Sequence, residues 1–473
     1  MISRIELIPT TPLSHPFVRA ALSCGFEQKG YVEEEYFLHG TSNIYEETAQ
    51  GDVRVLFADA PYINRMVVRR PAEPDLFSGN VVLEVLNPSA RVDIDRIWVE
   101  TWPHLMRRGD IYIGLTSKAD VLDALYQVDS QRYAPLSWAN PLPGRPLPKP
   151  GAFPVLPQYE NGLLWDMLSD LATLFKQGGE PSPLCGFTKS WLYLAGWSQC
   201  GGFLTRYRET FANRAGEALG EPVFDGYFHA GAGSARAPIN SFSDSEPFFE
   251  TRPNFPGYIA SSEPFMVINT ETETPHTRWG GDMDLPYAKF RVYEFAGSSH
   301  DSKYNLIDYY ADDDDLDKIG RRQPYYGLEL HPLDYPYEYL FAAAFHNLCV
   351  WVREGVPPPP SLKVDRLADG ESRKDAFGNT SGGVRSPFID LPTCLYSKYC
   401  TLKDEPGKTR DFWGHVVPFE PPVLKALYSS LDNYRNLVAQ RTDEIICRGY
   451  LLAADREHII RDAVNFARKR GLT

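Results

Sequence analysis

Long apolar runs are absent from this sequence of 473 residues. No stretch approaches the roughly 20 consecutive apolar residues that a helix needs to span a bilayer, so no membrane-spanning helix is expected. The first six residues, Met1 to Glu6, also lack the apolar core of a signal peptide. The sequence therefore predicts a cytoplasmic protein without a membrane partner.

Cysteine is sparse, and the common metal-binding motifs are missing. The seven cysteines are scattered, with only Cys394 and Cys400 close together, and no C-x-x-C or H-E-x-x-H motif occurs. A chain of this size does not need a disulfide framework, and we expect mostly buried free thiols. The acidic run Asp312–Asp315 lacks the spacing of an EF-hand and is typical of a solvated loop. No metal or other cofactor is expected.

Positive charge is in deficit, since 48 Lys and Arg residues face 62 Asp and Glu residues and the formal net charge is -14. Nucleic acids and anionic membranes select basic surfaces, so neither is an expected partner. Tyrosine, phenylalanine and proline are plentiful, at 27, 26 and 39 residues. The length fits one large α/β domain with insertions or two to three smaller domains, and we favour a single domain over 1–473.

Short apolar strands alternate with helical patterns along most of the chain, which predicts a mostly parallel sheet with helices on both faces. Residues 1–50 are predicted as an N-terminal β extension. Segments 131–159 and 301–385, rich in proline and tyrosine, are predicted as insertions that form a cap or rim. Strands are expected at 80–86, 111–115, 192–197, 223–232, 264–269 and 290–295, and helices at 94–108, 162–175, 199–215, 339–353 and within 421–470. Pro103 should kink or break the first helix.

A serine on a tight turn lies between one of these strands and the next helix. Ser198 follows the apolar run Leu192–Trp197, with Gly196 two residues before it and the small Cys200 two residues after it. Small neighbours are needed where a backbone bends sharply enough to expose a hydroxyl at a helix N-terminus. A helix N-cap serine is the competing interpretation of the pattern G-x-S-x-small.

Two further chemical groups follow later strands. The acidic loop after strand 264–269 holds Glu271 and Glu273, and His300 follows strand 290–295 in a Gly/Ser loop. Imidazole can take a proton from a serine hydroxyl, and a carboxylate fixes the imidazole tautomer. His229 and His276 are weaker candidates for the base. The turn Asn87–Ala90 directly follows strand 80–86, where a parallel sheet exposes backbone donors, although it could also be an ordinary turn.

Five stretches together resemble the α/β-hydrolase superfamily, and in detail a bacterial group known only as "alpha/beta hydrolase domain" proteins. They span most of the chain in the right order: Glu35–Tyr45, Gly79–Ser89, Leu194–Gly202, Tyr293–His300 and Asp375–Arg385. The chain order serine, acid, histidine is also that of the superfamily. The resemblance implies Ser198 as nucleophile, His300 as base, and an oxyanion hole formed by the N–H of Gln199 and a donor in the Asn87–Ala90 loop.

Further site residues are predicted as follows. The resemblance also implies an acid at Glu273, which lies, counted from Pro264, where the superfamily usually carries its acid, and Glu271 is the alternative. Among the loop residues Asn87, Ser89 and Ala90 are the candidate oxyanion donors, and Trp197 and Arg385 are candidates for substrate contact. The expected activity is hydrolysis of a small carboxylic ester through an acyl-enzyme. An amidase, thioesterase or acyltransferase, or a non-catalytic binding module, is the alternative. The sequence is compatible with a homo-oligomer.

Overall fold

The computed structural model describes residues 1–18, 20–48, 52–148, 155–179, 181–188, 191–244, 246, 252, 254–322, 328–403, 405–410 and 412–473. The chain divides into two compact units. Unit 1 comprises Met1–Phe265, Leu285–Lys289 and Ala311–Arg322, and unit 2 comprises Met266–Asp284, Phe290–Tyr310 and Gln323–Thr473. Residues 149–154 and 323–327 of the two predicted insertions lie outside the described part of the chain.

Seven strands of the large sheet lie wholly in unit 1, in the order β1-β2-β3-β5-β4-β6-β7. Their bounds are β1 Ile2–Ile8, β2 Tyr31–Glu47, β3 Val53–Pro71, β4 Asn80–Val85, β5 Ile111–Leu115, β6 Trp191–Trp197 and β7 Gly226–Ala230. The neighbours β5-β4, β4-β6 and β6-β7 pair in parallel. The first three strands pair antiparallel, as do β3 and β5. This arrangement confirms the predicted parallel centre with an N-terminal β extension.

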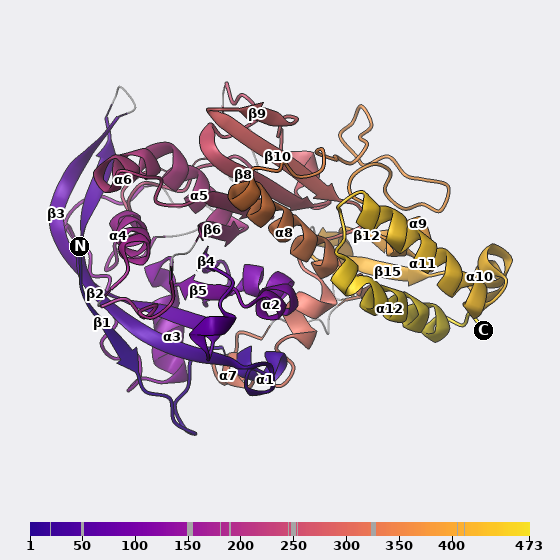
Figure 1. Ribbon diagram of the computed structural model, residues 1–473, viewed down its shortest axis with the longest axis horizontal. Helices are drawn as coiled ribbons and strands as arrows, with labels where there is room; N and C mark the ends of the chain where they lie inside the picture. Colours follow the sequence, from indigo (N-terminus) through magenta and orange to yellow (C-terminus); the bar gives the residue numbers. More distant parts are fainter. Residues whose placement is uncertain are drawn as a thin grey trace. The chain divides into compact units, whose positions relative to one another are not determined.

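The extension is longer than the sequence predicts. Strand β2 continues through His39 and Gly40, and β2 and β3 form a long curved ribbon (Figure 1). A side chain at Gly40 would lie 2.6 Å from Tyr62 Oη and 2.7 Å from the backbone oxygen of Met1. Gly40 therefore lies inside a strand, at a point where neighbouring segments of the sheet approach closely, and not in a turn.

Two helices that follow parallel strands frame the sheet of unit 1. Helix α2, Arg96–Arg108, connects β4 to β5, and α5, Gln199–Thr210, follows β6 on the way to β7. The two connections step in opposite directions across the sheet, and right-handed crossovers then place the helices on opposite faces. The other helices of unit 1 are α1 Ala20–Cys24, α3 Leu122–Val128, α4 Leu164–Gln177, α6 Ala212–Leu219 and α7 Asp315–Lys318.

Helix α2 continues through Pro103, so of the two expected effects of this proline, a kink or a break, the break does not occur. Ile97, Trp98, Val99 and Leu105 on this helix are completely buried. Full burial of each such side chain contributes about 1.5–3 kcal/mol, whereas a proline inside a helix costs about 3 kcal/mol. Packing of the apolar face therefore outweighs the missing hydrogen bond.

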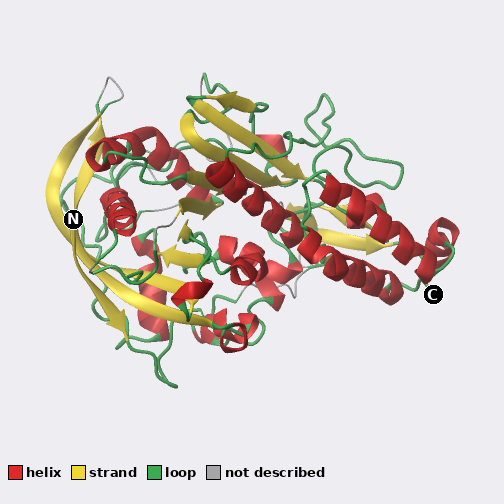
Figure 2. Cartoon of the chain, viewed as in Figure 1, coloured by secondary structure: helices red, strands yellow, loops and turns green. Residues whose placement is uncertain are grey.

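Unit 2 contains the ends of two further strands of the large sheet and all the C-terminal elements. The predicted strands at 264–269 and 290–295 are confirmed as β8, Ser261–Thr270, and β10, Ala288–Phe295, with β9, Met283–Leu285, next to β10. Smaller strands are β11 His331–Pro332, β12 Cys394–Ser397, β13 Cys400–Leu402, β14 Glu405–Arg410 and β15 His415–Pro418. The helices are α8 Glu338–Glu354, α9 Pro387–Asp390, α10 Pro421–Tyr428, α11 Leu431–Cys447 and α12 Arg456–Lys469. Figure 2 shows α11 and α12 as a helical pair.

The tyrosines of the predicted 301–385 insertion are largely packed inside unit 2. Tyr309 and Tyr310 are buried with ring centroids 4.9 Å apart, and the buried Tyr335 and Tyr337 are 5.9 Å apart. Such ring pairs stabilise a core and leave no free aromatic face. These four rings therefore belong to the core of unit 2.

All seven cysteines are free thiols, as expected from their spacing. Among the described residues, three aspartates, Asp313 to Asp315, are the one group of acidic, histidine or cysteine side chains close enough to share an ion. Lys318 pairs with two of them, with Nζ 3.2 Å from Asp314 and 3.0 Å from Asp315. No described helix is long and apolar enough to cross a bilayer.

Candidate active site

Ser198 occupies a strained turn between β6 and α5 in unit 1. Its backbone has φ 59° and ψ -121°, a conformation that residues other than glycine rarely adopt. The Ser198 N–H donates to the backbone oxygen of Ala230 at 2.9 Å, and the Ser198 oxygen accepts from the Gly201 N–H at 2.8 Å. The turn is thus anchored on both sides, which is the geometry of a nucleophile elbow.

The small residues around Ser198 are required by space. A side chain at Gly196 would lie 2.8 Å from the backbone oxygen of Cys200, and one at Gly201 would lie 2.6 Å from Ala232 Cβ. Helix α5 can therefore approach β6 at Gly196, and the segment after β7 at Gly201, only because these two positions lack a Cβ. The elbow interpretation of the pattern G-x-S-x-small rests on these contacts as well as on the backbone angles.

Cys200 is a packing residue of the elbow. Its side chain is completely buried, and Sγ lies 3.3 Å from the backbone oxygen of Leu86 and 3.9 Å from Ser117 Oγ. Burial raises the pKa of this thiol well above its usual value. The thiol therefore stays protonated and is a poor nucleophile.

The Asn87 side chain connects the Asn87–Ala90 loop to the elbow by a hydrogen bond. Its Nδ2 donates to the backbone oxygen of Trp197 at 2.8 Å, and its Oδ1 accepts from the Ser89 N–H at 2.8 Å. The Asn87 N–H itself donates to the backbone oxygen of Ile94 at 2.9 Å. Of the three predicted donors in this loop, Asn87 and Ser89 are thus already bonded.

Two backbone donors remain available near the elbow. The Ala90 N–H has no acceptor within the described part of the chain. The Gln199 N–H begins helix α5, where the first N–H groups have no partner inside the helix. These two groups are the best candidates for an oxyanion hole, with Asn87 acting as a positioning residue.

Replacement of Asn87 by alanine should lower kcat/KM for an ester about 10- to 100-fold, because the loop carrying Ala90 loses its tie to the elbow. Asn80 provides a matched control, since it is also buried, begins the same strand β4 and donates Nδ2 to Asp110 Oδ1 at 3.0 Å. Asn80→Ala should lower the melting temperature without lowering kcat. Equal loss of turnover in both variants would contradict the positioning role of Asn87.

A buried carboxylate supports the helix that follows this loop. Glu84 Oε1 accepts from the Ile97 N–H at 2.9 Å, and Oε2 accepts from the Trp98 N–H at 3.1 Å and from Tyr112 Oη at 2.7 Å. Burial raises the pKa of Glu84 to about 8, although these donors favour its charged form. All of its contacts are structural, so its role is to fix the start of α2.

His300 and Glu273 form a close pair in unit 2. His300 Nδ1 and Glu273 Oε1 are 2.7 Å apart, and both side chains are nearly buried. Glu273 Oε2 accepts from the Thr270 N–H at 2.7 Å and from Thr270 Oγ1 at 2.8 Å. The carboxylate thus has one oxygen for the imidazole and one held by two donors, which fixes its orientation.

The backbone and ring of His300 are also held in place. Its N–H donates to Thr272 Oγ1 at 3.0 Å, and the Phe412 ring meets the imidazole edge-on with centroids 5.1 Å apart. Thr270 and Thr272 were not predicted as site residues. Their signal in the sequence is the alternation Thr270-Glu271-Thr272-Glu273-Thr274, which places hydroxyls on either side of each carboxylate.

Glu271 makes different contacts from Glu273. Its Oε2 accepts from the backbone N–H of Gly297 at 2.9 Å, and its Oε1 lies 3.3 Å from Lys374 Nζ. Of the two candidate acids, only Glu273 is placed against the imidazole of His300 in the described chain. The structure therefore favours Glu273 as the partner of His300.

His229 is unsuited to the role of base. It lies on β7 with no exposed surface, and its ring packs so closely on α5 that a Cβ at Gly201 would lie 2.8 Å from Nε2. Burial lowers the pKa of His229 from 6.5 to about 4. The imidazole is therefore neutral and enclosed at neutral pH.

The low pKa of His229 predicts acid sensitivity. Between pH 6.5 and about 4 the unfolded chain binds more protons than the folded chain, because His229 has the lower pKa when it is buried. The contribution of His229 to the free energy of unfolding is therefore fully present above pH 6.5 and is lost as pH falls. We expect the free energy of unfolding to drop by about 2 kcal/mol between pH 7.5 and pH 5 from this group alone. Urea unfolding should show a smaller pH dependence for His229→Gln and an unchanged one for the exposed control His458→Gln. The same pH dependence in all three proteins would refute this assignment.

The two residues expected to contact substrate are both engaged within their own units. Trp197 is 1% exposed and packs its ring against the guanidinium of Arg96, 5.5 Å from the ring centroid. Arg385 bonds Asp390 at 2.6 Å and Asp375 at 2.8 Å. These contacts give each side chain a structural role.

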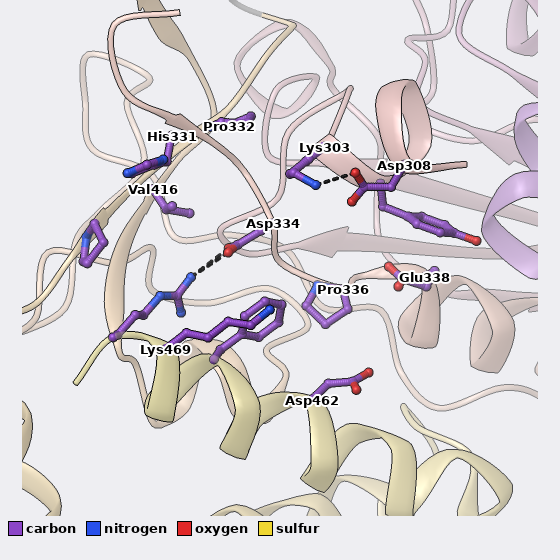
Figure 3. A pocket seen from close by; sticks show the side chains of 14 residues that line it. Lys303, Asp308, His331, Pro332, Asp334, Pro336, Glu338, Val416, Asp462 and Lys469 are labelled. Atoms are coloured by element: carbon purple, nitrogen blue, oxygen red, sulfur yellow. Dashed lines mark hydrogen bonds and ion pairs between the residues drawn. The ribbon is translucent and has the colours of Figure 1, made fainter. Parts of the chain in front are cut away.

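A separate pocket on unit 2 has a volume of about 460 Å³ and contains neither Glu273 nor His300 among its described lining residues (Figure 3). Two ion pairs lie within its walls. Arg470 bonds both oxygens of Asp334 at 2.8 and 2.9 Å, and Lys303 pairs with Asp308. The pocket is therefore not part of the candidate active site.

Comparison with solved structures finds distant similarity only. Solved structures that are similar include a lipase/esterase from Lactobacillus plantarum, with 9% identity, a TM-score of 0.25, and coverage of 49% of this chain and 80% of that one. XC6422 from Xanthomonas campestris, an a/b serine hydrolase without lid, has 13% identity, a TM-score of 0.21, and coverage of 49% and 71%. Candida antarctica lipase A has 11% identity, a TM-score of 0.21, and coverage of 49% and 42%.

No curated protein matches the chain significantly. A family model described as "Alpha/beta hydrolase domain", however, matches residues 4–461. This match covers the parallel strands, the Ser198 elbow and the Glu273–His300 pair in one continuous stretch. The chain therefore belongs to the alpha/beta hydrolase domain family.

Proposed function

We propose that this protein is a serine hydrolase that cleaves a small carboxylic ester through a covalent acyl-enzyme. The observation that carries the proposal is the strained elbow at Ser198, with φ 59° on a residue other than glycine. Strain of this kind persists only where the surroundings impose it, and it is concentrated at functional sites. The paired His300 and Glu273 supply the base and the acid that a serine nucleophile requires.

In the proposed first half-reaction, His300 Nε2 takes the proton of Ser198 Oγ while Oγ bonds to the ester carbonyl carbon. The carbonyl electron pair moves to the oxygen, which the N–H groups of Gln199 and Ala90 would stabilise. The bond to the alcohol then breaks, and the alcohol leaves with the proton from His300. Each donor of this kind is worth about 3–4 kcal/mol of the barrier.

The second half-reaction repeats these steps with water. His300 removes a proton from the water, the hydroxyl attacks the acyl carbon, and Ser198 Oγ leaves with the proton. Glu273 keeps Nδ1 of His300 protonated and stabilises the imidazolium in both halves. The products are a carboxylic acid and the free enzyme, with no cofactor consumed.

Comparative rates test the proposed ester specificity against other acyl-transfer reactions on the same machinery. The wild-type protein should hydrolyse p-nitrophenyl acetate or butyrate faster than an acyl thioester and much faster than a p-nitroanilide of the same acyl group. A faster rate on the thioester or the anilide would replace the esterase assignment by a thioesterase or amidase. If the protein cleaves none of these substrates and no serine reacts with a fluorophosphonate, a binding protein on a hydrolase fold would be favoured.

A further inference from the structure

Glu271 connects the end of β8 to the turn that precedes His300. Besides accepting from the Gly297 N–H at 2.9 Å, it donates its own N–H to Ser298 Oγ at 3.3 Å. Gly297 has φ 73°, and a Cβ there would lie 2.4 Å from Ile389 Cδ1. The turn is therefore a tight one that only glycine can form, and Glu271 holds it by the backbone.

The Glu271 carboxylate needs a counter-ion because its side chain has no exposed surface. Lys374 supplies one, with Nζ 3.3 Å from Glu271 Oε1 and a second bond of 2.8 Å to Thr380 Oγ1. The lysine side chain is 46% exposed, so the ammonium reaches the buried carboxylate from the surface.

The segment that carries Lys374 is itself attached to the strand leading to His300. The Val384 N–H donates to the Glu294 backbone oxygen at 2.8 Å, and the Ala296 N–H donates to the Val384 oxygen at 3.1 Å. These two bonds come directly before the Gly297 turn. The glycine-rich segment 374–384 therefore contributes both backbone hydrogen bonds and a cation to the region that holds His300.

We propose that Lys374 is a positioning residue for His300, acting through Glu271 and the Gly297–Ser298 turn. The inference rests on the proposed function, because it gives Lys374 a purpose only if His300 is the base. It assigns a role to the 374–384 segment, which holds no catalytic side chain. It also gives Glu271 a role distinct from that of Glu273.

Kinetics of Lys374 variants test the proposal. Lys374→Met should lower kcat for p-nitrophenyl butyrate about 10- to 30-fold with KM unchanged, because the base is misplaced while substrate binding is not. Lys374→Arg should keep kcat within about threefold, since it retains the charge. Lys318→Met is a matched control, because Lys318 is also 46% exposed and pairs with a carboxylate, Asp315, that has no exposed surface. Its kcat should equal that of the wild type.

A double variant separates lost charge pairing from general damage. In Lys374→Met combined with Glu271→Gln, no unpaired buried charge remains and the amide oxygen can still accept from the Gly297 N–H. Its kcat should be at least about threefold higher than that of Lys374→Met alone. A kcat of Lys374→Met equal to that of the wild type would overturn the proposal, as would an equal loss in Lys374→Arg.

Hydrogen exchange gives a result that does not depend on catalysis. Amides at 296–300 should exchange at least about tenfold faster in Lys374→Met and at the wild-type rate in Lys374→Arg. If the wild type cleaves no ester but this exchange pattern appears, the proposed function fails while Lys374 still holds the turn. If the wild type cleaves esters but exchange is unchanged in Lys374→Met, the positioning role fails alone.

Discussion

Replacing Ser198 by alanine is expected to lower kcat/KM for p-nitrophenyl acetate by about 10⁴-fold or more while the protein remains folded. The change removes one oxygen atom and leaves the anchors of the turn, which are backbone hydrogen bonds to Ala230 and from Gly201. The residual rate would come from the remaining oxyanion donors and from substrate binding. Initial rates and circular dichroism of the two proteins, measured side by side, check both halves of the prediction.

Ser117→Ala is the appropriate control. Ser117 is a buried serine of the same unit, donates to the backbone oxygen of Leu86 at 2.6 Å and lies against the thiol of Cys200. Its loss should reduce stability by about 1 kcal/mol and leave kcat/KM close to the wild-type value. If Ser198→Ala were as active as Ser117→Ala, another residue would be the nucleophile.

Glu273→Gln is expected to reduce kcat/KM about 10³- to 10⁴-fold, a much larger loss than Glu271→Gln should cause. The reason lies in the two donors of Thr270, which both point at Glu273 Oε2. A glutamine would place its oxygen there and turn its NH₂ towards His300 Nδ1. The imidazole would then carry its proton on Nε2, the tautomer that cannot accept a proton from serine.

Glu271→Gln retains an acceptor for the Gly297 N–H and should cost less than about tenfold in kcat/KM. The two glutamates lie two residues apart and are both buried, so the pair controls for position and burial. Steady-state rates of the two variants at the same pH decide the ranking. A larger loss in Glu271→Gln would transfer the role of acid to that residue.

The elements around the candidate site were predictable because each depends on local sequence. The apolar run before Ser198 and the small residues around it define β6, the turn and α5 without reference to the rest of the chain. The same holds for His300, which follows β10 after a short Gly/Ser turn. Hydrophobic pattern and turn residues together are sufficient for such strand–turn units.

Features that depend on distant neighbours were not predictable in this way. Gly40 is a turn signal in isolation, and only the approach of Tyr62 and Met1 explains it inside a strand. Pro103 breaks a helix in isolation, and only the burial of the α2 side chains shows why the helix continues. In both cases tertiary packing overrides local preference.

The different roles of Glu271 and Glu273 were also not predictable from the sequence. Both have suitable chemistry and both follow β8, but their partners, Gly297 and His300, lie 26 and 27 residues further along the chain. The same is true of Asn87, whose amide reaches Trp197 across 110 residues. Side-chain reach of this kind follows from the folded backbone and not from spacing in the chain.

Covalent labelling tests the central claim most directly. The wild-type protein and His300→Ala would be treated with a fluorophosphonate, and the adducts counted by intact mass and located by peptide mapping. We predict a single adduct on Ser198 that forms at least about 10³-fold more slowly in His300→Ala, because the hydroxyl then lacks its base. An adduct on another residue, or equal labelling rates in the two proteins, would contradict a nucleophile at Ser198 activated by His300.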